Sequence, residues 1–169
     1  MYKVKRYHNA EKPFELDRSR KYNQAVTFKP RGLWFGFGNA WIEWCRSEMP
    51  QWVRQHTYEV EPNGANILML KTEADFLAFN REYKADYYEE DGRRIEGMKI
   101  LLGIDWPKLA SEYAGIEIPV YLWKFRLHPE FMWFYGWDCA SGCIWNVRDI
   151  ELRHVKTNLQ PNGYMKMRK

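Results

Sequence analysis

The stretch YGWDCASGCIWNV, Tyr135 to Val147, holds two tryptophans, two cysteines, one aspartate and one serine within thirteen residues. Large aromatic residues usually build cores, whereas Gly, Asp and Ser usually build turns. The mixture predicts a turn that runs directly into a strand, GCIWNV, and we expect the two to form one wall of a cleft. Asp138 and Ser141 would present polar groups at the rim of that cleft. The tryptophans expected to pack this wall are Trp133, Trp137 and Trp145.

The chain around this stretch has the length and composition of one folded domain. Its 169 residues suit a compact domain over 1–155, followed by a polar, basic tail over 156–169. Aromatic residues make up 17% of the chain and include nine tryptophans, which predicts a core or cleft of flat, rigid side chains. Charged residues, at 28%, are ordinary in number, and this argues against disorder.

Charge and hydropathy narrow the possible partners and the compartment. The net charge is +4, and no block of like charge demands a nucleic-acid partner, although an anionic ligand such as a nucleotide would be compatible. The N-terminal residues are polar and unlike a signal peptide, and no run of about 18 apolar residues could span a bilayer. We therefore expect a cytoplasmic protein with reduced thiols and no membrane partner.

The cysteines do not form a pattern typical of a metal site. Cys139 and Cys143 form CxxxC, with Cys45 and four histidines elsewhere, whereas zinc needs about four ligands at usable spacings. We expect buried free thiols, no disulfide and no metal. Neither GxGxxG nor a Walker loop occurs, and the ASGC around Ser141 lacks the G-x-S-x-G of a nucleophile elbow, which argues against a serine hydrolase.

Hydrophobic periodicity predicts short strands with about three helices between them, which favours the α+β class. The expected strands are 2–8, 25–37 broken by Pro30 and Gly32, 57–62, 66–71, 115–118 and 142–147, the last either continuing or turning over 148–155. The turn signal Asn63-Gly64 predicts that 57–62 and 66–71 form a hairpin. The expected helices are 39–55, 72–84 and 105–113, with Asn39, Thr72 and Asp105 as N-caps. Residues 85–103 are ambiguous and partly loop, and 124–134 are expected to form a loop.

Three positions are candidates for ligand contacts. His8, just after the first predicted strand, could bind a ribose hydroxyl or act as a base, or it could be an edge histidine. In KPRGLWFG, a glycine would let a ligand approach the backbone and an aromatic ring could stack on it, unless the motif is only a turn that feeds a core strand. Strand alternation places Leu33 and Phe35 toward the core and Trp34 toward a cleft. Glu117 could line the cleft, although exposure to solvent is the default for glutamate.

Several short motifs, taken together, resemble the ADP-ribosyltransferase fold. RYHN is similar to a first strand that ends in histidine, and RGLWFG is similar to a second strand with Trp34 in the aromatic place. EYAGIEI and GCIWNVRDIEL look like two late strands of phage-associated members. In that alignment Trp145-Asn146 takes the place of Phe-Asp, and Ser141 falls where the catalytic glutamate is expected. The wider chain also resembles a group of small bacterial and phage proteins that share GLW, YxGIEI and WDCASGCIWN. This second resemblance implies no particular activity.

The first resemblance implies a single domain with a curved or split, antiparallel-rich β-core and NAD as the cofactor. It implies that His8, Trp34 and Ser141 converge on one cleft. Together with Asp138, these residues would be the catalytic residues. The implied cofactor contacts are Arg6, Asn9, Arg31, Gly32, Leu33 and Trp34. Serine at 141 removes the carboxylate that commonly holds the nicotinamide ribose, so the acid would be Asp138, Glu117 or Glu151, or the domain binds without turnover.

Two hypotheses of different classes therefore stand. One is an NAD-dependent transferase of the ADP-ribosyltransferase kind that modifies a host macromolecule. The other is a non-catalytic binding module of a phage or mobile element, an anti-defence or host-interaction protein, which uses the same cleft for a nucleotide, a host protein or a nucleic acid. Fold likeness alone does not choose between them.

Overall fold

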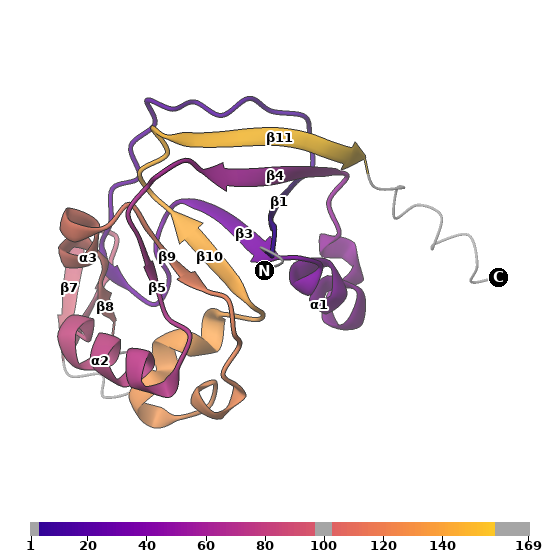
Figure 1. Ribbon diagram of the computed structural model, residues 1–169. Coiled ribbons are helices and arrows are strands. Elements are labelled where there is room, and N and C mark those ends of the chain that lie inside the picture. The colour runs from indigo at the N-terminus through magenta and orange to yellow at the C-terminus, as the bar shows by residue number, and fades with distance from the viewer. Residues whose placement is uncertain (1–3, 97–102, 158–169) are drawn as a thin grey trace.

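A computed structural model describes residues 4–96 and 103–157 of the chain. They form a mixed α+β structure with a mostly antiparallel seven-stranded sheet (Figure 1). The strands are β1 (Arg6–Ala10), β2 (Val26–Thr27), β3 (Leu33–Phe37), β4 (His56–Pro62), β5 (Ile67–Met69), β6 (Tyr87–Glu90), β7 (Arg93–Glu96), β8 (Ile104–Asp105), β9 (Gly115–Ile118), β10 (Ser141–Ile144) and β11 (Ile150–Thr157). The helices are α1 (Ala40–Glu48), α2 (Glu73–Tyr83) and α3 (Trp106–Glu112), with 3₁₀ helices η1 (Pro50–Trp52), η2 (Trp123–Phe125) and η3 (Pro129–Gly136).

The main sheet has the order β11-β4-β1-β3-β10-β9-β5, and its strands turn strongly from one edge to the other. Figure 1 shows β11 and β4 running across the top of the view, while β5, β9 and β10 run steeply down it. β5 pairs with β9 in parallel, and the other neighbouring strands of this sheet are antiparallel. The remaining described strands form the two-stranded sheets β2-β8 and β6-β7.

β10 lies inside the sheet because its residues allow strands to pack tightly on both sides. Gly142 pairs with Phe35 of β3 and with Glu117 of β9. A Cβ atom at Gly142 would lie 2.3 Å from Cζ of Phe35, so this ring occupies the space that any larger residue would need. Gly142 is thus part of an internal strand, as the predicted strand 142–147 has it.

Alternation along the strands produces a hydrophobic core on each face of the sheet. Leu33, Phe35 and Ile144 belong to one core, and their register partners place their side chains on one face. Ile116 and Ile118 belong to the other core. This second core is larger and mostly aromatic, and its largest members include Phe76, Trp106, Trp133, Phe134 and Trp137.

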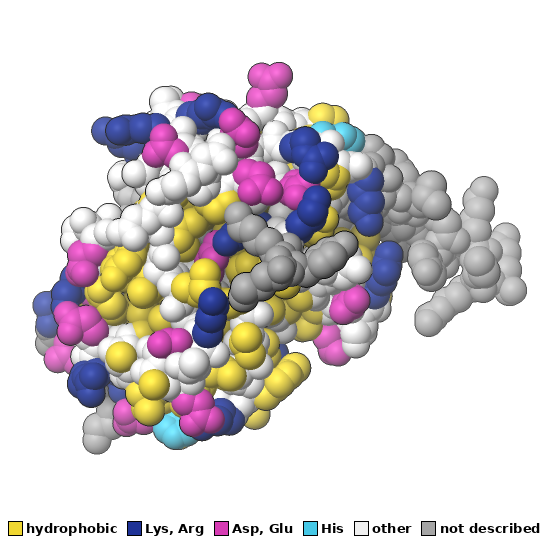
Figure 2. All heavy atoms as spheres, in the orientation of Figure 1, with side chains coloured by type: hydrophobic (Ala, Val, Ile, Leu, Met, Phe, Trp, Pro, Cys, Tyr) yellow, Lys and Arg dark blue, Asp and Glu magenta, His cyan; other side chains and the backbone are white. Residues whose placement is uncertain are grey.

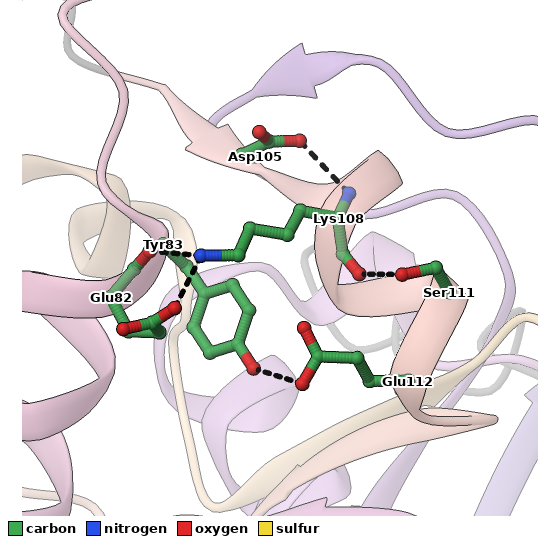
Figure 3. A network of polar contacts seen from close by, with 6 residues as sticks. All are labelled: Glu82, Tyr83, Asp105, Lys108, Ser111 and Glu112. Carbon is green, nitrogen blue, oxygen red and sulfur yellow. Dashed lines mark hydrogen bonds and ion pairs between the residues drawn. The ribbon is translucent and has the colours of Figure 1, made fainter.

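The predicted helices 72–84 and 105–113 are present, and both begin at the expected cap. The Thr72 hydroxyl accepts a hydrogen bond from the Asp75 amide in a full capping box, and the Asp105 carboxylate accepts one from the Lys108 amide. Figure 3 shows the polar network that joins α2 to α3. There Lys108 Nζ contacts both the carbonyl and the carboxylate of Glu82. The Tyr83 hydroxyl donates to Glu112 at 3.1 Å.

The predicted helix 39–55 is shorter than expected, because α1 ends at Glu48 and η1 follows it. Asn39 occupies the N-cap position but makes no side-chain capping bond. The residues expected as a loop over 124–134 largely form η2 and η3.

The predicted hairpin of 57–62 with 66–71 is wrong. A turn does form at Asn63-Gly64, with φ of +78° at Gly64, but the two strands diverge after it. β4 pairs with β1 and β11, whereas β5 pairs with β9 at the far edge of the sheet. The turn signal therefore predicted a reversal of the chain and not the partner of either strand.

A hairpin occurs instead within the ambiguous segment, where β6 pairs with β7. Its turn is Asp91-Gly92, and both residues have positive φ, 49° and 74°, as the favoured two-residue hairpin turn requires. Residues 97–102 of that segment lie outside the described residues. So does most of the predicted tail, since β11 continues to Thr157 and 158–169 are not described. Among the described helices, none has the length and hydropathy needed to cross a membrane.

Candidate functional site

A pocket of about 280 Å³ collects residues from both halves of the chain. It is lined by His8 of β1, Trp34 of β3 and Ser141 of β10, together with Asp138 from the segment before β10. These are the four residues that sequence analysis grouped as one site, and the structure brings them together. Asn9 also lines the pocket, as do Lys29, Trp41 and Trp137.

His8 lies where strands β1 and β3 separate. The two strands pair only at Arg6 with Phe37 and at Tyr7 with Gly36. The expectation that His8 follows the first strand is wrong, because β1 continues to Ala10. Its Nδ1 lies 2.6 Å from the carbonyl oxygen of Trp34. A carbonyl can only accept, so Nδ1 carries the proton, and in the neutral ring Nε2 keeps its lone pair. Burial lowers the pKa of His8, against a smaller opposing effect of this hydrogen bond, and the neutral form is favoured.

Two indoles and a lysine form the aromatic part of the pocket. The rings of Trp34 and Trp137 pack edge to face with centroids 4.8 Å apart. Lys29 Nζ lies 4.7 Å from the centroid of the Trp34 ring, a cation–π contact. Although Lys29 as a whole is exposed, the burial of its ammonium end lowers its pKa, and the nearby Asp138 charge opposes this shift. Trp34 is half-buried, while Leu33 and Phe35 are buried on the opposite face, as alternation predicted.

Asp138 supplies a carboxylate to the pocket. Burial raises its pKa, and the charges of Lys29 and Arg126 oppose that rise. Arg126 Nη2 lies 3.4 Å from Asp138 Oδ1, and the same guanidinium donates to the Tyr121 hydroxyl at 3.2 Å. Two cations therefore favour the ionised form of a carboxylate that burial disfavours, and Asp138 is held in place for acid, base or electrostatic work.

Ser141 was expected at the rim of the cleft. It is buried instead, because it begins the internal strand β10. Its hydroxyl donates to the Cys139 carbonyl at 2.8 Å. The thiols are poor nucleophiles at neutral pH, because burial raises the pKa of Cys45 to about 11 and of Cys139 to about 12, and raises that of Cys143 further. All three cysteines are buried and free, and no cluster of three or more potential metal ligands occurs within residues 4–96 and 103–157.

Trp137, one of the residues that line the pocket, has an unsatisfied donor. Trp137 is 1% exposed, and in the described part of the chain its Nε1 is the single buried side-chain nitrogen or oxygen without a hydrogen-bond partner. By comparison, the buried Trp133 donates to Asn80 Oδ1 at 3.0 Å and Trp106 donates to the Thr27 carbonyl at 2.8 Å. A buried donor without a partner costs free energy.

Several predicted contacts lie away from the pocket lining. Arg6 makes a two-point ion pair with Glu117, at 2.6 and 2.9 Å, and its side chain is 11% exposed. Glu117 is therefore buried, at 1% exposure, and not facing water. Arg31 is exposed and donates to the Asn23 carbonyl, whereas Leu33 is in the core. Gly32 packs against the Ile144 carbonyl, which a Cβ atom would approach to 2.5 Å.

Sequence analysis did not place Lys29, Trp41 or Trp137 in the site. Trp137 was expected only to pack the wall, and its lack of a hydrogen-bond partner has no signature in sequence. Trp41 falls within the predicted helix 39–55, and the structure shows why it also reaches the pocket. Gly36 lies directly beneath it, and a Cβ atom there would be 2.9 Å from Trp41 Cβ. The one available signal was the clustering of Lys29 and Trp34 around a glycine.

Figure 2 shows hydrophobic side chains gathered across the middle of one face and over its lower part, where Figure 1 places η2 and η3. This segment contributes Trp123 and Tyr135, which are 68% and 51% exposed. The Arg126 guanidinium lies over both rings, at 5.6 and 5.5 Å from their centroids. Through Arg126 this exposed aromatic surface adjoins Asp138 of the pocket.

In comparisons with known proteins, no family model, no curated protein and no solved structure matches the chain.

Proposed function

We propose that the protein binds a nucleotide, NAD first among the candidates, with one flat ring held in the pocket of His8, Trp34, Asp138 and Ser141. The observation that carries this proposal is that four residues selected from short, separated motifs line one pocket. The motifs resemble those of ADP-ribosyltransferases, in which such residues surround the nicotinamide end of NAD. Trp34 offers a half-buried indole face, and Lys29 supplies a cation beside it for an anionic group.

The size of the pocket limits what part of a nucleotide it can take. Pockets for drug-sized ligands usually have about 300–1,000 Å³. At about 280 Å³, this one suits a single ring with its immediate substituents and not a whole dinucleotide.

If the protein turns NAD over, the bond between the ribose C1′ and nicotinamide breaks, and nicotinamide leaves with the electron pair. Asp138 would stabilise the cationic sugar, because it is the carboxylate that lines the pocket. The acceptor's nucleophile then forms a bond to C1′, and its proton passes to Asp138 or to the free Nε2 of His8. Glu117, the alternative acid on β9, is committed to Arg6.

Binding without turnover is the second candidate, and a specific observation favours it. The position expected for the catalytic glutamate holds Ser141, whose hydroxyl is used within the protein on the Cys139 carbonyl. A serine cannot supply the negative charge that stabilises the sugar cation. A module that holds the nucleotide and presents the exposed aromatic surface near Arg126 to a host macromolecule would need no such charge.

One experiment separates these possibilities. The purified protein is titrated with NAD by calorimetry, and nicotinamide release is followed by chromatography for wild type, Asp138→Asn and Trp34→Ala. Glu151→Gln serves as a control, because Glu151 is exposed on β11 and does not line the pocket. Release that Asp138→Asn abolishes while NAD still binds supports the transferase. Binding without release supports the module. If NAD does not bind, or binds to Trp34→Ala as well as to wild type, the proposal is wrong.

A further inference from the structure

A second pocket, of about 490 Å³, lies between the segment after β1 and the strands β4 and β11. Two histidines from neighbouring strands line it, His56 of β4 and His154 of β11. His154 pairs in register with Tyr58, and the strand irregularity after His154 aligns Thr157 with His56. Since His56 and Tyr58 are two residues apart, they share a face, and the two imidazoles meet diagonally on it.

The distance between the two ring nitrogens fits two ligands on one metal ion. His56 Nδ1 lies 3.3 Å from His154 Nε2, and the ring planes meet at 47°. Two nitrogens bound to a tetrahedral ion at 2.0–2.1 Å are about 3.3 Å apart. We propose that His56 and His154 bind one divalent transition-metal ion of the zinc type, for which neutral imidazole is a preferred ligand.

The two other histidines of the chain are engaged elsewhere, which makes this pair distinctive. His8 Nδ1 bonds the Trp34 carbonyl, and His128 Nδ1 accepts from the Glu130 amide at the start of η3. At the pair itself, a direct bond between the two nitrogens requires that one ring donate a proton and the other accept it. A metal ion bonds to both lone pairs at once, while the opposite nitrogen of each ring carries the proton.

The site has two protein ligands, since no group of three or more His, Cys, Asp or Glu side chains surrounds a possible ion in the described residues. The ion therefore keeps positions for water or for an external ligand, as catalytic and exchangeable sites do. His56 is half-buried and His154 exposed, so an ion can enter without unfolding. Binding joins β4 to the edge strand β11 and stabilises the folded state by mass action.

The test uses the full-length, untagged protein after metal removal, titrated with Zn²⁺ by calorimetry. We expect one equivalent to bind, and His56→Gln and His154→Gln each to weaken binding at least about tenfold, since even outer-sphere changes cost 10–100-fold. His128→Gln is the matched control, an exposed histidine outside the pair, and should bind as wild type does. Circular dichroism establishes that each variant is folded.

Two further measurements make the outcome decisive. Zn²⁺ should raise the melting temperature of wild type and His128→Gln but not of His56→Gln. Cu²⁺ resonance spectra should show two coupled nitrogens in wild type and at most one in His154→Gln. Binding that survives loss of either paired histidine, or no binding at all, would leave only an imidazole–imidazole hydrogen bond and overturn the proposal. Because this pocket shares no lining residue with that of His8, neither result bears on nucleotide binding.

Discussion

Trp34 belongs both to the pocket of His8 and Ser141 and to the aromatic core, because its ring is half-buried and packs on Trp137. We predict that Trp34→Ala weakens NAD binding about 5- to 150-fold, the equivalent of about 1–3 kcal/mol for a base stacked on an aromatic ring. Trp34→Phe should lose less, since a flat apolar ring remains. Calorimetric titration measures both.

The core aromatic Trp133 provides the contrast, since it is 1% exposed and outside the pocket. Trp133→Ala should reduce the free energy of unfolding by about 3–5 kcal/mol. If Trp34→Ala caused a loss of that size with unchanged affinity in the folded fraction, Trp34 would be a core residue only.

Arg6 and Glu117 form a buried ion pair between strands that are not neighbours in the sheet. We predict that Glu117→Gln or Arg6→Met lowers the free energy of unfolding by about 3–5 kcal/mol, because each leaves a buried charge without its partner. The double variant Arg6→Met/Glu117→Leu should be less destabilised than the sum of the single changes. Urea unfolding curves test this, and strictly additive losses would contradict the coupling.

At the scale of elements, the helix caps differ in a way that can be measured. The Asp105 side chain caps α3, whereas Asn39 occupies the same position of α1 without a side-chain capping bond. Asp105→Ala should therefore cost about 1 kcal/mol, and Asn39→Ala much less. Thermal unfolding of the two variants side by side gives the comparison, and equal losses would contradict the predicted difference between the two caps.

β10 is the strand least tolerant of added volume. Gly142→Ala would place a methyl group 2.3 Å from Phe35 Cζ, so we predict a loss of about 1–3 kcal/mol from overpacking. Phe35→Leu in the same chain should restore part of that loss by removing the ring atoms in conflict. Denaturant unfolding measures the free energy of unfolding of each variant. If the double variant lost more stability than the two single changes together, crowding by Phe35 would not be the cause.

For the whole molecule, His8 makes stability depend on pH. Burial lowers the pKa of His8 from its ordinary value of 6.5, so below that pH the unfolded chain binds the proton more readily than the folded one. The free energy of unfolding should fall as pH drops below about 6.5, until the pKa of the folded state is passed. His8→Gln should flatten the dependence between pH 7.5 and 5, whereas His128→Gln should keep it. Denaturant unfolding across that range provides the measurement.

Local sequence predicted which side of β3 faces the pocket and where two helices begin. Strand alternation around Trp34 separates the core side from the pocket side, and the caps at Thr72 and Asp105 are read within one turn of helix. The grouping of His8 and Ser141 came from resemblance to known motifs and not from local signals. No pattern revealed the unpartnered Nε1 of Trp137, because the absence of a partner is a property of the whole packing.

The sequence by itself determined the α+β class, the positions of most elements and the faces of its strands, because propensity, capping and alternation act over a few residues. The tertiary structure alone decided which strands pair and which charges are buried. It placed β5 beside β9 and not β4, and it buried Glu117 against Arg6, a residue 111 positions away. The physical reason is that partners distant in the chain are selected by the total packing of two cores, and no short stretch of sequence contains both members of such a pair.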